Sequence, residues 1–477
     1  LHFRSVSVQI RSRTVEVFQV LYEMVSKYQT DANKARLKLD KVSDTMCLAK
    51  WMQTSLHLTT GMTNSCYHPP LHKIDLEQIK NNPSKLHNTD EKKSQRDQML
   101  HGKRPAGCSY CWKLEDNKQM SDRFYRSGEP WAMDNYQNIL QDPHADVVPT
   151  YVEVDFSSAC NFKCSYCSPQ FSTAWEQEAE EHGAYPTNVP HNDPAHFQGE
   201  RKVLAHKDNP YVEAFWQWWP ELYPKLKHFR MTGGEPMMDK NTYKVFDYVI
   251  DNPKQDLHLN VTSNFCPPAP ALGDKYFNSV KTICDGAMIE HFMQFVSLDA
   301  WGEKAEYIRN GMDFGTVWYN VNRFLTDIQG HNSITFIITM NNLSVSSLKT
   351  LMENILTLRQ KYSSTYQRVW FDTPILRQPI WQHIGLLDES FAHYFEDAID
   401  YMKQHQHSTD MVAFRDYEIA KLQRTFQIMK QGIDDKHIHM ANFWRFFRTH
   451  DVRRNTDLIA TFPEYSQWFD QCQKATQ

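Results

Sequence analysis

The chain has 477 residues, of which 41% are hydrophobic and 23% are charged, and its formal net charge is -5. This composition is typical of a foldable globular protein, and the length allows about three domains. The mean hydropathy is -0.64, and the sequence lacks the run of about 18 apolar residues that an ordinary transmembrane helix needs. The negative net charge argues against a protein that binds nucleic acid through a generally basic surface, but it does not exclude a local basic groove.

The first third of the chain shows little strand pattern. Residues 1–45 are polar and helical in pattern, as in an N-terminal tail. Residues 46–147 hold four cysteines around a lysine-rich middle, which indicates loops and short helices. We therefore expect a cysteine-rich domain here with few long elements.

From residue 148 to 385 strand and helix patterns alternate. Alternating apolar residues predict strands at 151–156, 227–231, 257–262, 293–298, 334–339 and 369–371. Helical periodicity fills several of the intervals, for example at 243–250 and 347–362. This order predicts βαβ units and a parallel α/β sheet. Residues 386–477 are helical in pattern to the end of the chain.

The ten cysteines restrict the chemistry more than the composition does. Seven of them fall in clustered spacings, and residues 1–30 show no continuous apolar signal-peptide region. Disulfide frameworks belong mainly to small secreted chains. We therefore expect a cytoplasmic protein whose thiolates bind metal.

A cysteine triplet follows the first predicted strand. Cys160, Cys164 and Cys167 have the spacing C-x3-C-x2-C. Thiolates select iron–sulfur clusters or zinc, and three ligands leave one iron of a [4Fe–4S] cube open. A zinc knuckle with a fourth ligand from Cys266 or a histidine is the alternative.

A glycine turn follows the second predicted strand. It consists of Gly233, Gly234, Glu235 and Pro236. The two glycines would let the backbone approach a ligand closely, and Glu235 could accept hydrogen bonds from an ammonium group. A plain strand-to-helix turn is the alternative. In a parallel sheet both motifs would lie at the carboxyl ends of strands, where ligand sites occur.

Together with the aromatic Tyr166 before the third cysteine, these motifs make residues 148–375 resemble the radical S-adenosylmethionine (radical SAM) enzymes. The resemblance implies a partial (βα)6 TIM-like barrel. It implies that Cys160, Cys164 and Cys167 hold a catalytic [4Fe–4S] cluster whose open iron binds S-adenosylmethionine. The cluster would cleave this cofactor to a 5′-deoxyadenosyl radical that abstracts hydrogen from a substrate, with electrons from a donor such as flavodoxin or ferredoxin.

The resemblance extends to further cofactor contacts at later strand ends. Ser263 and Asn264 follow the third strand, and Ser297 and Asp299 lie at the fourth; such polar residues would bind the ribose. Arg309 could pair with the methionyl carboxylate. The alternatives are a surface arginine for Arg309 and a helix N-cap for Asp299.

The four flanking cysteines form a second group. Cys47, Cys66, Cys108 and Cys111 would suit zinc or a fully ligated [4Fe–4S] cluster. With Gly61, the spacing of the first two resembles the half-motif of SPASM and twitch domains, although here it precedes the barrel. This resemblance implies an auxiliary cluster that conducts electrons.

The resulting functional hypothesis is an oxidoreductase that modifies a peptide or protein. A radical SAM dehydrogenase or epimerase of a carbohydrate or nucleoside-like metabolite is the second choice. A non-catalytic protein with two zinc sites, binding RNA or protein through the basic stretch 92–104, is the rival from another class, and a ferredoxin-like carrier is a further one. No membrane partner is expected.

Overall fold

The structure is a computed structural model that describes residues 30–193, 209–364, 366–407 and 411–477. The chain divides into two compact units. The first comprises residues up to 157 with 202–233 and 254–260, and the second comprises the remaining residues. Most of the expected helical tail at 1–45 lies outside the described residues, but residues 30–39 are helical.

The first unit is built on a mixed sheet. Its strand order is β3-β2-β1-β4-β6, followed by the first residues of β7. β1 pairs in parallel with β4, β4 in parallel with β6, and β1 antiparallel with β2. The strands are β1 (Gln53–His57), β2 (Met62–Asn64), β3 (His72–Lys73), β4 (Tyr151–Asp155), β6 (His228–Thr232) and β7 (Lys254–Ser263). β1, β2 and β3 are a correction to the expectation of loops and short helices in 46–147.

Short helices complete the first unit. Trp51, Phe124 and Trp131 form its hydrophobic core together with Cys108 and Cys111. This core places the cysteine-bearing segments against one another. The helices are α2 (Ala49–Met52), α3 (Leu76–Asn81), α4 (Asp90–Leu100), α5 (Ser109–Asp116), α6 (Asp122–Gly128), α7 (Pro130–Met133), α8 (Tyr136–Gln141) and α11 (Pro210–Leu222).

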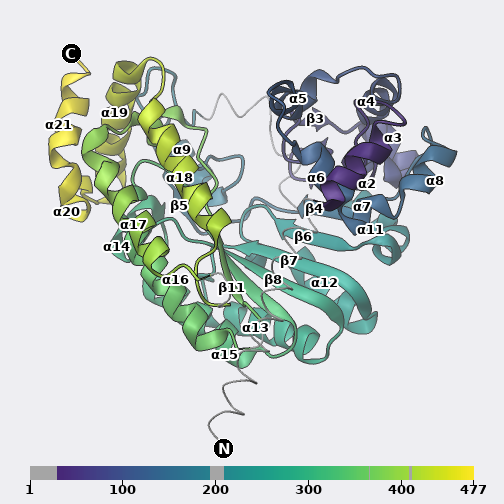
Figure 1. The fold of residues 1–477 in the computed structure, drawn as a ribbon. Helices are drawn as coiled ribbons and strands as arrows, with labels where there is room; N and C mark the ends of the chain where they lie inside the picture. Colours follow the sequence, from purple (N-terminus) through teal and green to yellow (C-terminus); the bar gives the residue numbers. More distant parts are fainter. Residues whose placement is uncertain (1–29, 194–208, 365, 408–410) are drawn as a thin grey trace, which may run out of the picture. The chain divides into compact units, whose positions relative to one another are not determined.

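The second unit continues from the last residues of β7 through three parallel strands and a two-stranded ribbon. β10 (Asn332–Ile337) pairs in parallel with β8 (Ile289–Ser297) and β11 (Val369–Asp372). The ribbon joins β5 (Lys163–Cys164) to β9 (Arg309–Asn310) in antiparallel register. The helices before and between these strands are α9 (Thr173–His182), α12 (Lys240–Asp251), α13 (Pro270–Asp285), α14 (Glu303–Ile308), α15 (Phe314–Asp327) and α16 (Leu348–Tyr362) (Figure 1).

The C-terminal part of the second unit is helical, as predicted. α17 packs against both α16 and α18, and α19 packs against α21. α20 also contacts α14, which precedes it in the same unit. Their bounds are α17 (Ala392–Gln404), α18 (Asp416–Gln431), α19 (Lys436–Arg454), α20 (Leu458–Thr461) and α21 (Ser466–Lys474).

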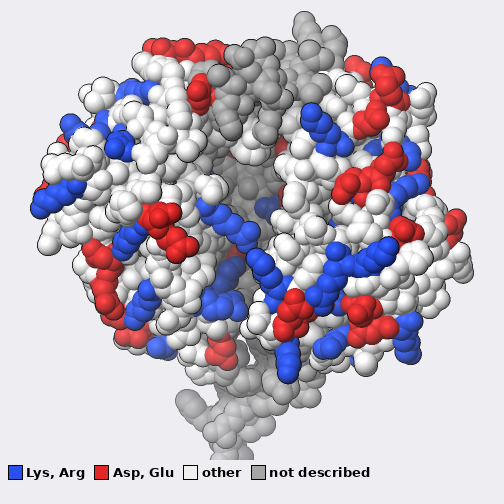
Figure 2. Space-filling model, turned by 90° about the horizontal axis from the view of Figure 1, so that it is seen from above, with Lys and Arg blue, Asp and Glu red and all other residues white. Residues whose placement is uncertain are grey.

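The structure therefore confirms a mixed α/β protein rich in parallel strand pairs. All six strands predicted between 148 and 385 are present, with helices in the intervals between β7, β8, β10 and β11. Among the described residues, no helix combines the length and the apolar character needed to cross a membrane. Figure 2 shows acidic and basic side chains interspersed over one face.

Candidate active site

The cysteine triplet lies on a loop of the second unit that other elements hold from several sides. Cys164 lies in β5, directly opposite Arg309 of β9, and the Ser165 N–H donates to the Ile308 carbonyl over 2.8 Å. The Trp175 indole donates to the Cys164 carbonyl over 2.8 Å. The Phe162 N–H points at the Cys160 sulfur over 3.4 Å. The loop backbone is thus fixed at both its first and second cysteine.

Burial makes the three thiols hard to ionise on their own. It raises the pKa of Cys160 and Cys164, and that of Cys167 to about 12. Thiolate is the metal-binding form, so bound positive charge is what would stabilise it here. Among the described residues, no three His, Cys, Asp or Glu side chains converge as a single ion requires. A cube offers a different iron to each thiolate, so three loop thiols suit a cluster without converging on one point.

The glycine turn lies against the backbone that leads into the cysteine loop. An added Cβ on Gly234 would come within 2.3 Å of the Ala159 carbonyl oxygen, and the Glu235 N–H donates to that oxygen over 2.7 Å. Gly233 has φ +112°, and its Cβ would meet Asp155 at 2.8 Å. In the structure these glycines let the turn approach other parts of the same chain closely. That they also let a bound ligand approach the backbone stays a prediction.

Glu235 accepts hydrogen bonds from two of the residues that were predicted to contact the cofactor. It is buried; its Oε1 accepts from the Ser263 hydroxyl over 2.7 Å, and its Oε2 accepts from the Asn264 N–H over 2.6 Å. Burial raises the pKa of Glu235 to about 7, against the opposing effect of these hydrogen bonds. The Asn264 amide in turn donates to Asn161, which lies inside the cysteine loop, over 2.8 Å. Pro236 begins the buried turn that follows.

Asp299 accepts hydrogen bonds from two further residues of the predicted cofactor site, Tyr166 and Arg309. Its buried carboxylate accepts hydrogen bonds from the Tyr166 hydroxyl over 2.6 Å, the Arg309 guanidinium over 2.8 Å and the Thr339 N–H over 2.8 Å. It does not cap a helix, because α14 begins at Glu303 with Gly302 as its N-cap. Arg309 is buried and therefore is not the surface arginine of the alternative interpretation. Ser297 ends β8 opposite Ile337.

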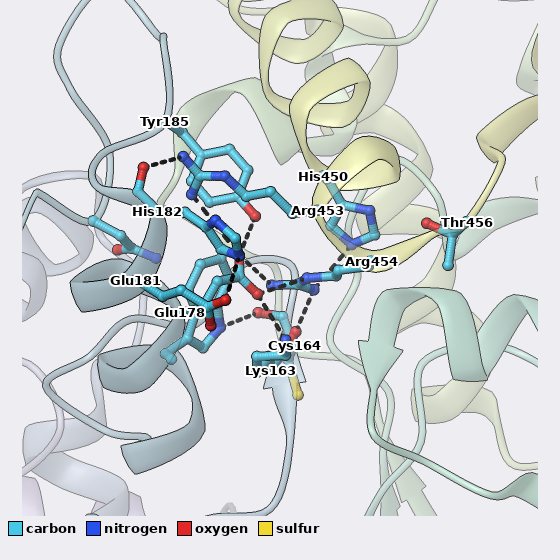
Figure 3. A network of polar contacts seen from close by, with 12 residues as sticks. Lys163, Cys164, Glu178, Glu181, His182, Tyr185, His450, Arg453, Arg454 and Thr456 are labelled. Atoms are coloured by element: carbon cyan, nitrogen blue, oxygen red, sulfur yellow. Dashed lines mark hydrogen bonds and ion pairs between the residues drawn. The ribbon is translucent and has the colours of Figure 1, made fainter.

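A polar network behind β5 was not predicted from sequence. The Lys163 ammonium pairs with Glu178 over 2.8 Å, and Arg454 reaches both Glu178, over 3.1 Å, and the Lys163 carbonyl, over 2.7 Å (Figure 3). Burial opposes ionisation of Glu178, but Arg454 and the hydrogen bonds outweigh it and lower its pKa to about 2. The last turn of α19 thereby fixes the residue before Cys164. No local pattern signals this contact, since 291 residues separate its two ends.

The four flanking cysteines come together in the first unit. Cys47, Cys66, Cys108 and Cys111 line one cavity of about 30 Å³. Burial raises the pKa of Cys66 to about 11 and that of Cys111 to about 12. Gly61 has φ +65°, and an added Cβ would lie 2.3 Å from the Tyr211 ring. The glycine of the motif is thus required by packing of α11 against the turn after β1.

Buried basic side chains lie beside this four-cysteine pocket, and burial lowers the pKa of one of them, Lys92, well below its usual value. Lys50 lines it and donates to Gln95 over 2.7 Å. Lys92 donates to the hydroxyls of Thr54 and Thr63 over 2.7 and 2.8 Å. Arg96 donates to the Lys50 carbonyl and to Asn88. Among the described contacts, all the acceptors of these three side chains are neutral.

Comparisons with known proteins give a distant likeness in fold. No protein-family model and no curated protein sequence matches the chain. Two solved structures of SuiB from Streptococcus suis, one bound to S-adenosylmethionine and one to its precursor peptide SuiA, are similar at 11% identity. Each match covers 74% of this chain and 69% of the other, with a TM-score of 0.32. The function of this chain is therefore inferred from the residues of its two cysteine sites and not from this likeness.

Proposed function

We propose that the protein is a radical S-adenosylmethionine enzyme. Cys160, Cys164 and Cys167 would hold a [4Fe–4S] cluster, which supplies the electron that cleaves the bound cofactor to a 5′-deoxyadenosyl radical. The observation that carries the proposal is the hydrogen-bonded link from the cysteine loop through Asn161 and Asn264 to Glu235. It joins the loop proposed to hold the cluster to a buried carboxylate in one unit.

The residues around the triplet have chemistry that suits a zwitterionic ligand. Burial raises the pKa of Glu235 to about 7, against the opposing effect of its hydrogen bonds. A ligand ammonium beside it would stabilise the ionised form. Ser263, Asn264 and Ser297 offer polar groups for ribose hydroxyls, and the Arg309 Nε has no hydrogen-bond partner among the described atoms. These residues would therefore bind and orient the cofactor.

For the four-cysteine pocket we propose an auxiliary [4Fe–4S] cluster. Four thiols leave no open position, so the cluster would pass electrons and not bind substrate. A structural zinc ion is the second candidate on ligand count alone, since four thiolates are a common zinc set, but the described thiols do not converge on one point as a single ion requires. We further propose that flavodoxin or ferredoxin delivers the electrons, and that the reducing cytoplasm keeps these thiols available.

The proposed substrate is a peptide or protein, as the resemblance to enzymes with auxiliary clusters implies. A carbohydrate or nucleoside-like metabolite is the second choice. Deuterium-labelled pools of peptides, sugars and nucleosides would separate these two choices, because the hydrogen that the 5′-deoxyadenosyl radical abstracts would be recovered in the 5′-deoxyadenosine formed from it. Deuterium from the peptide pool supports the first choice, and deuterium from the small-molecule pools alone supports the second.

The first experiment is a metal analysis after anaerobic reconstitution. We expect about eight irons per chain, falling to about four in the Cys160/Cys164/Cys167→Ala variant, together with loss of 5′-deoxyadenosine formation. Cys284→Ala is the matched control, since Cys284 is a buried thiol of the same unit outside both sites. Zinc with little iron in both proteins would contradict the enzyme proposal and support a zinc-binding module.

A further inference from the structure

Arg309 reaches the triplet through the backbone ribbon. β9 places Arg309 directly opposite Cys164 of β5. The ribbon can close because Gly311, with φ +105°, leaves its neighbour room: an added Cβ there would lie 2.6 Å from the Asn161 carbonyl oxygen. From this position Nη1 of Arg309 lies 3.7 Å from the Cys164 sulfur, within range of an N–H···S hydrogen bond.

The guanidinium is held in this orientation by a carboxylate on its other side. Nη2 donates to Asp299 over 2.8 Å, and Asp299 is itself fixed by Tyr166 and by the Thr339 N–H. Arg309 and Asp299 are both buried. A guanidinium stays protonated in proteins, and the Asp299 carboxylate balances its buried charge. Arg309 therefore keeps its charge beside the sulfur.

We infer that Arg309 tunes the cluster of the triplet, by donating to the Cys164 sulfur and so stabilising the reduced state. Hydrogen bonds to cluster sulfurs and local charge are among the factors that set reduction potentials. An added electron makes the cluster more negative, so a fixed cation at one ligand favours its uptake. Asp299 and Tyr166 are positioning residues in this arrangement, because they act through Arg309.

This role differs from the pairing of Arg309 with the methionyl carboxylate that the family resemblance implies. Tuning through Cys164 operates without cofactor, whereas carboxylate pairing operates only with it. The inference rests on the proposed function, because it needs a cluster at the triplet. The iron content of the protein tests whether a cluster is present, and the reduction potential of that cluster tests the role of Arg309.

The experiment is a redox titration of the full-length reconstituted protein, followed by electron paramagnetic resonance without S-adenosylmethionine. The signal that the Cys160/Cys164/Cys167→Ala variant lacks belongs to the triplet. We expect Arg309→Gln to keep its iron and to be about tenfold harder to reduce, a shift of about 59 mV to lower potential for one electron. Arg309→Lys should shift it less, because lysine keeps the charge.

Arg453→Gln is the matched control. Its guanidinium lies in the same unit and donates to the backbone carbonyls of residues 182, 183 and 184, with no contact to a cysteine sulfur among the described atoms (Figure 3). We expect its potential to equal that of the wild type. An equal shift in Arg453→Gln would mean that the effect is not specific to the N–H···S contact, and would overturn the inference.

Arg309→Gln leaves the buried Asp299 carboxylate without its ion-pair partner and could therefore fail to fold. A second variant is needed for that case. Arg309→Gln combined with Asp299→Asn removes both charges of the pair and should still lower the potential, because the lost cation was nearer to the sulfur. An unchanged potential in an iron-replete variant would overturn the inference, above all if affinity for S-adenosylmethionine fell instead. Wild-type protein without iron at the triplet would contradict the proposed function itself.

Discussion

The two groups of cysteines differ in the charges buried around them. Near the triplet, the buried carboxylates Glu235 and Asp299 accompany the buried cation Arg309. Beside the four-cysteine pocket, Lys50, Lys92 and Arg96 are buried, and their described hydrogen bonds go to neutral groups. Near the triplet the buried cation is paired with a carboxylate. At the pocket Arg123 is likewise paired, with Glu115 over 2.7 Å, and Asp122 lines the cavity, whereas Lys50 and Arg96 have only neutral acceptors among the described contacts.

This difference indicates what each site is built to hold. A buried cation without a carboxylate is costly unless an anion lies near it. Four thiolates around iron or zinc leave a net negative centre, which would supply that anion. A balanced site with an open coordination position suits a ligand that is itself both cationic and anionic. The charge pattern thus agrees with a closed auxiliary centre and an open catalytic one.

The largest expected effect comes from removing two ligands of the four-cysteine pocket. In the variant Cys108→Ala/Cys111→Ala, about four of about eight irons should be lost. Cleavage of S-adenosylmethionine should persist, because the triplet lies in the other unit, while conversion of substrate stops. Iron analysis and quantification of 5′-deoxyadenosine against product measure this. Loss of cleavage as well would contradict the division of roles.

The next prediction concerns acid stability of the network behind the triplet. Burial, helped by Arg454, lowers the pKa of His450 to about 4 against the opposing effect of Asp451. A histidine held neutral stabilises the fold fully above its unfolded pKa of about 6.5, and that stability is lost as the pH falls toward 4. The loss is on the order of 3 kcal/mol from this group.

Denaturant unfolding between pH 7 and pH 4 tests this acid sensitivity. His450→Gln should lose less stability over this range than the wild type, whatever its stability at pH 7. His393→Gln, at an exposed position of α17, should keep the wild-type profile. If the free energy of unfolding of His450→Gln fell with pH as steeply as that of the wild type, the acid sensitivity would come from groups other than His450.

A smaller effect is expected for the buried carboxylate at the glycine turn. Glu235→Gln removes the charge that an ammonium would meet and places an amide donor against the Ser263 or Asn264 donor. Loss of one charged hydrogen bond costs about 1.5–3 kcal/mol, or roughly a 10- to 100-fold weaker affinity for S-adenosylmethionine. Calorimetric titration measures it, with the exposed Glu396→Gln as the control. If Glu235→Gln bound S-adenosylmethionine as tightly as the wild type, Glu235 would not contact the cofactor.

The smallest effect concerns the charge beside the four-cysteine pocket. Lys92→Met should stabilise the metal-free protein by about 1–2 kcal/mol, because it removes a buried amine whose pKa burial lowers well below its usual value and whose described partners are neutral. Thr54 and Thr63 would still hydrogen-bond to each other, over 3.2 Å. The gain should disappear in the metal-loaded protein. Lys93→Met, next to it but paired with Asp146 and partly exposed, should change stability by less than about 1 kcal/mol.

Much of the second unit could be predicted because its strands and helices are long and periodic. The strands at 293–298 and 334–339 and the helix at 347–362 were within a few residues of those observed. The motifs around Cys160 and Gly233 were also visible, because they are short and continuous in the chain. Local pattern was sufficient for these features.

Other parts of the site could not be predicted, for physical reasons. β5 and β9 have two residues each, which is too short for any periodicity, so the pairing of Cys164 with Arg309 was hidden. The ion pair of Arg454 with Glu178 links residues far apart in the chain. β1 was missed because its residues are buried without an alternating apolar pattern: Gln53, Thr54 and Ser55 are polar. Tertiary contacts decided each of these cases.

The pairing of β4 between β1 and β6 has a consequence for how the protein is made. β1 is synthesised about a hundred residues before its partner β4, and β6 comes still later. Until a growing chain has passed residue 155, β1 presents an open edge on the side that β4 will cover, and such edges favour aggregation. Both sets of cysteines will thus have left the ribosome before residues 202–233 and 254–260 complete the first unit, so any metal that binds earlier meets an unfinished first unit.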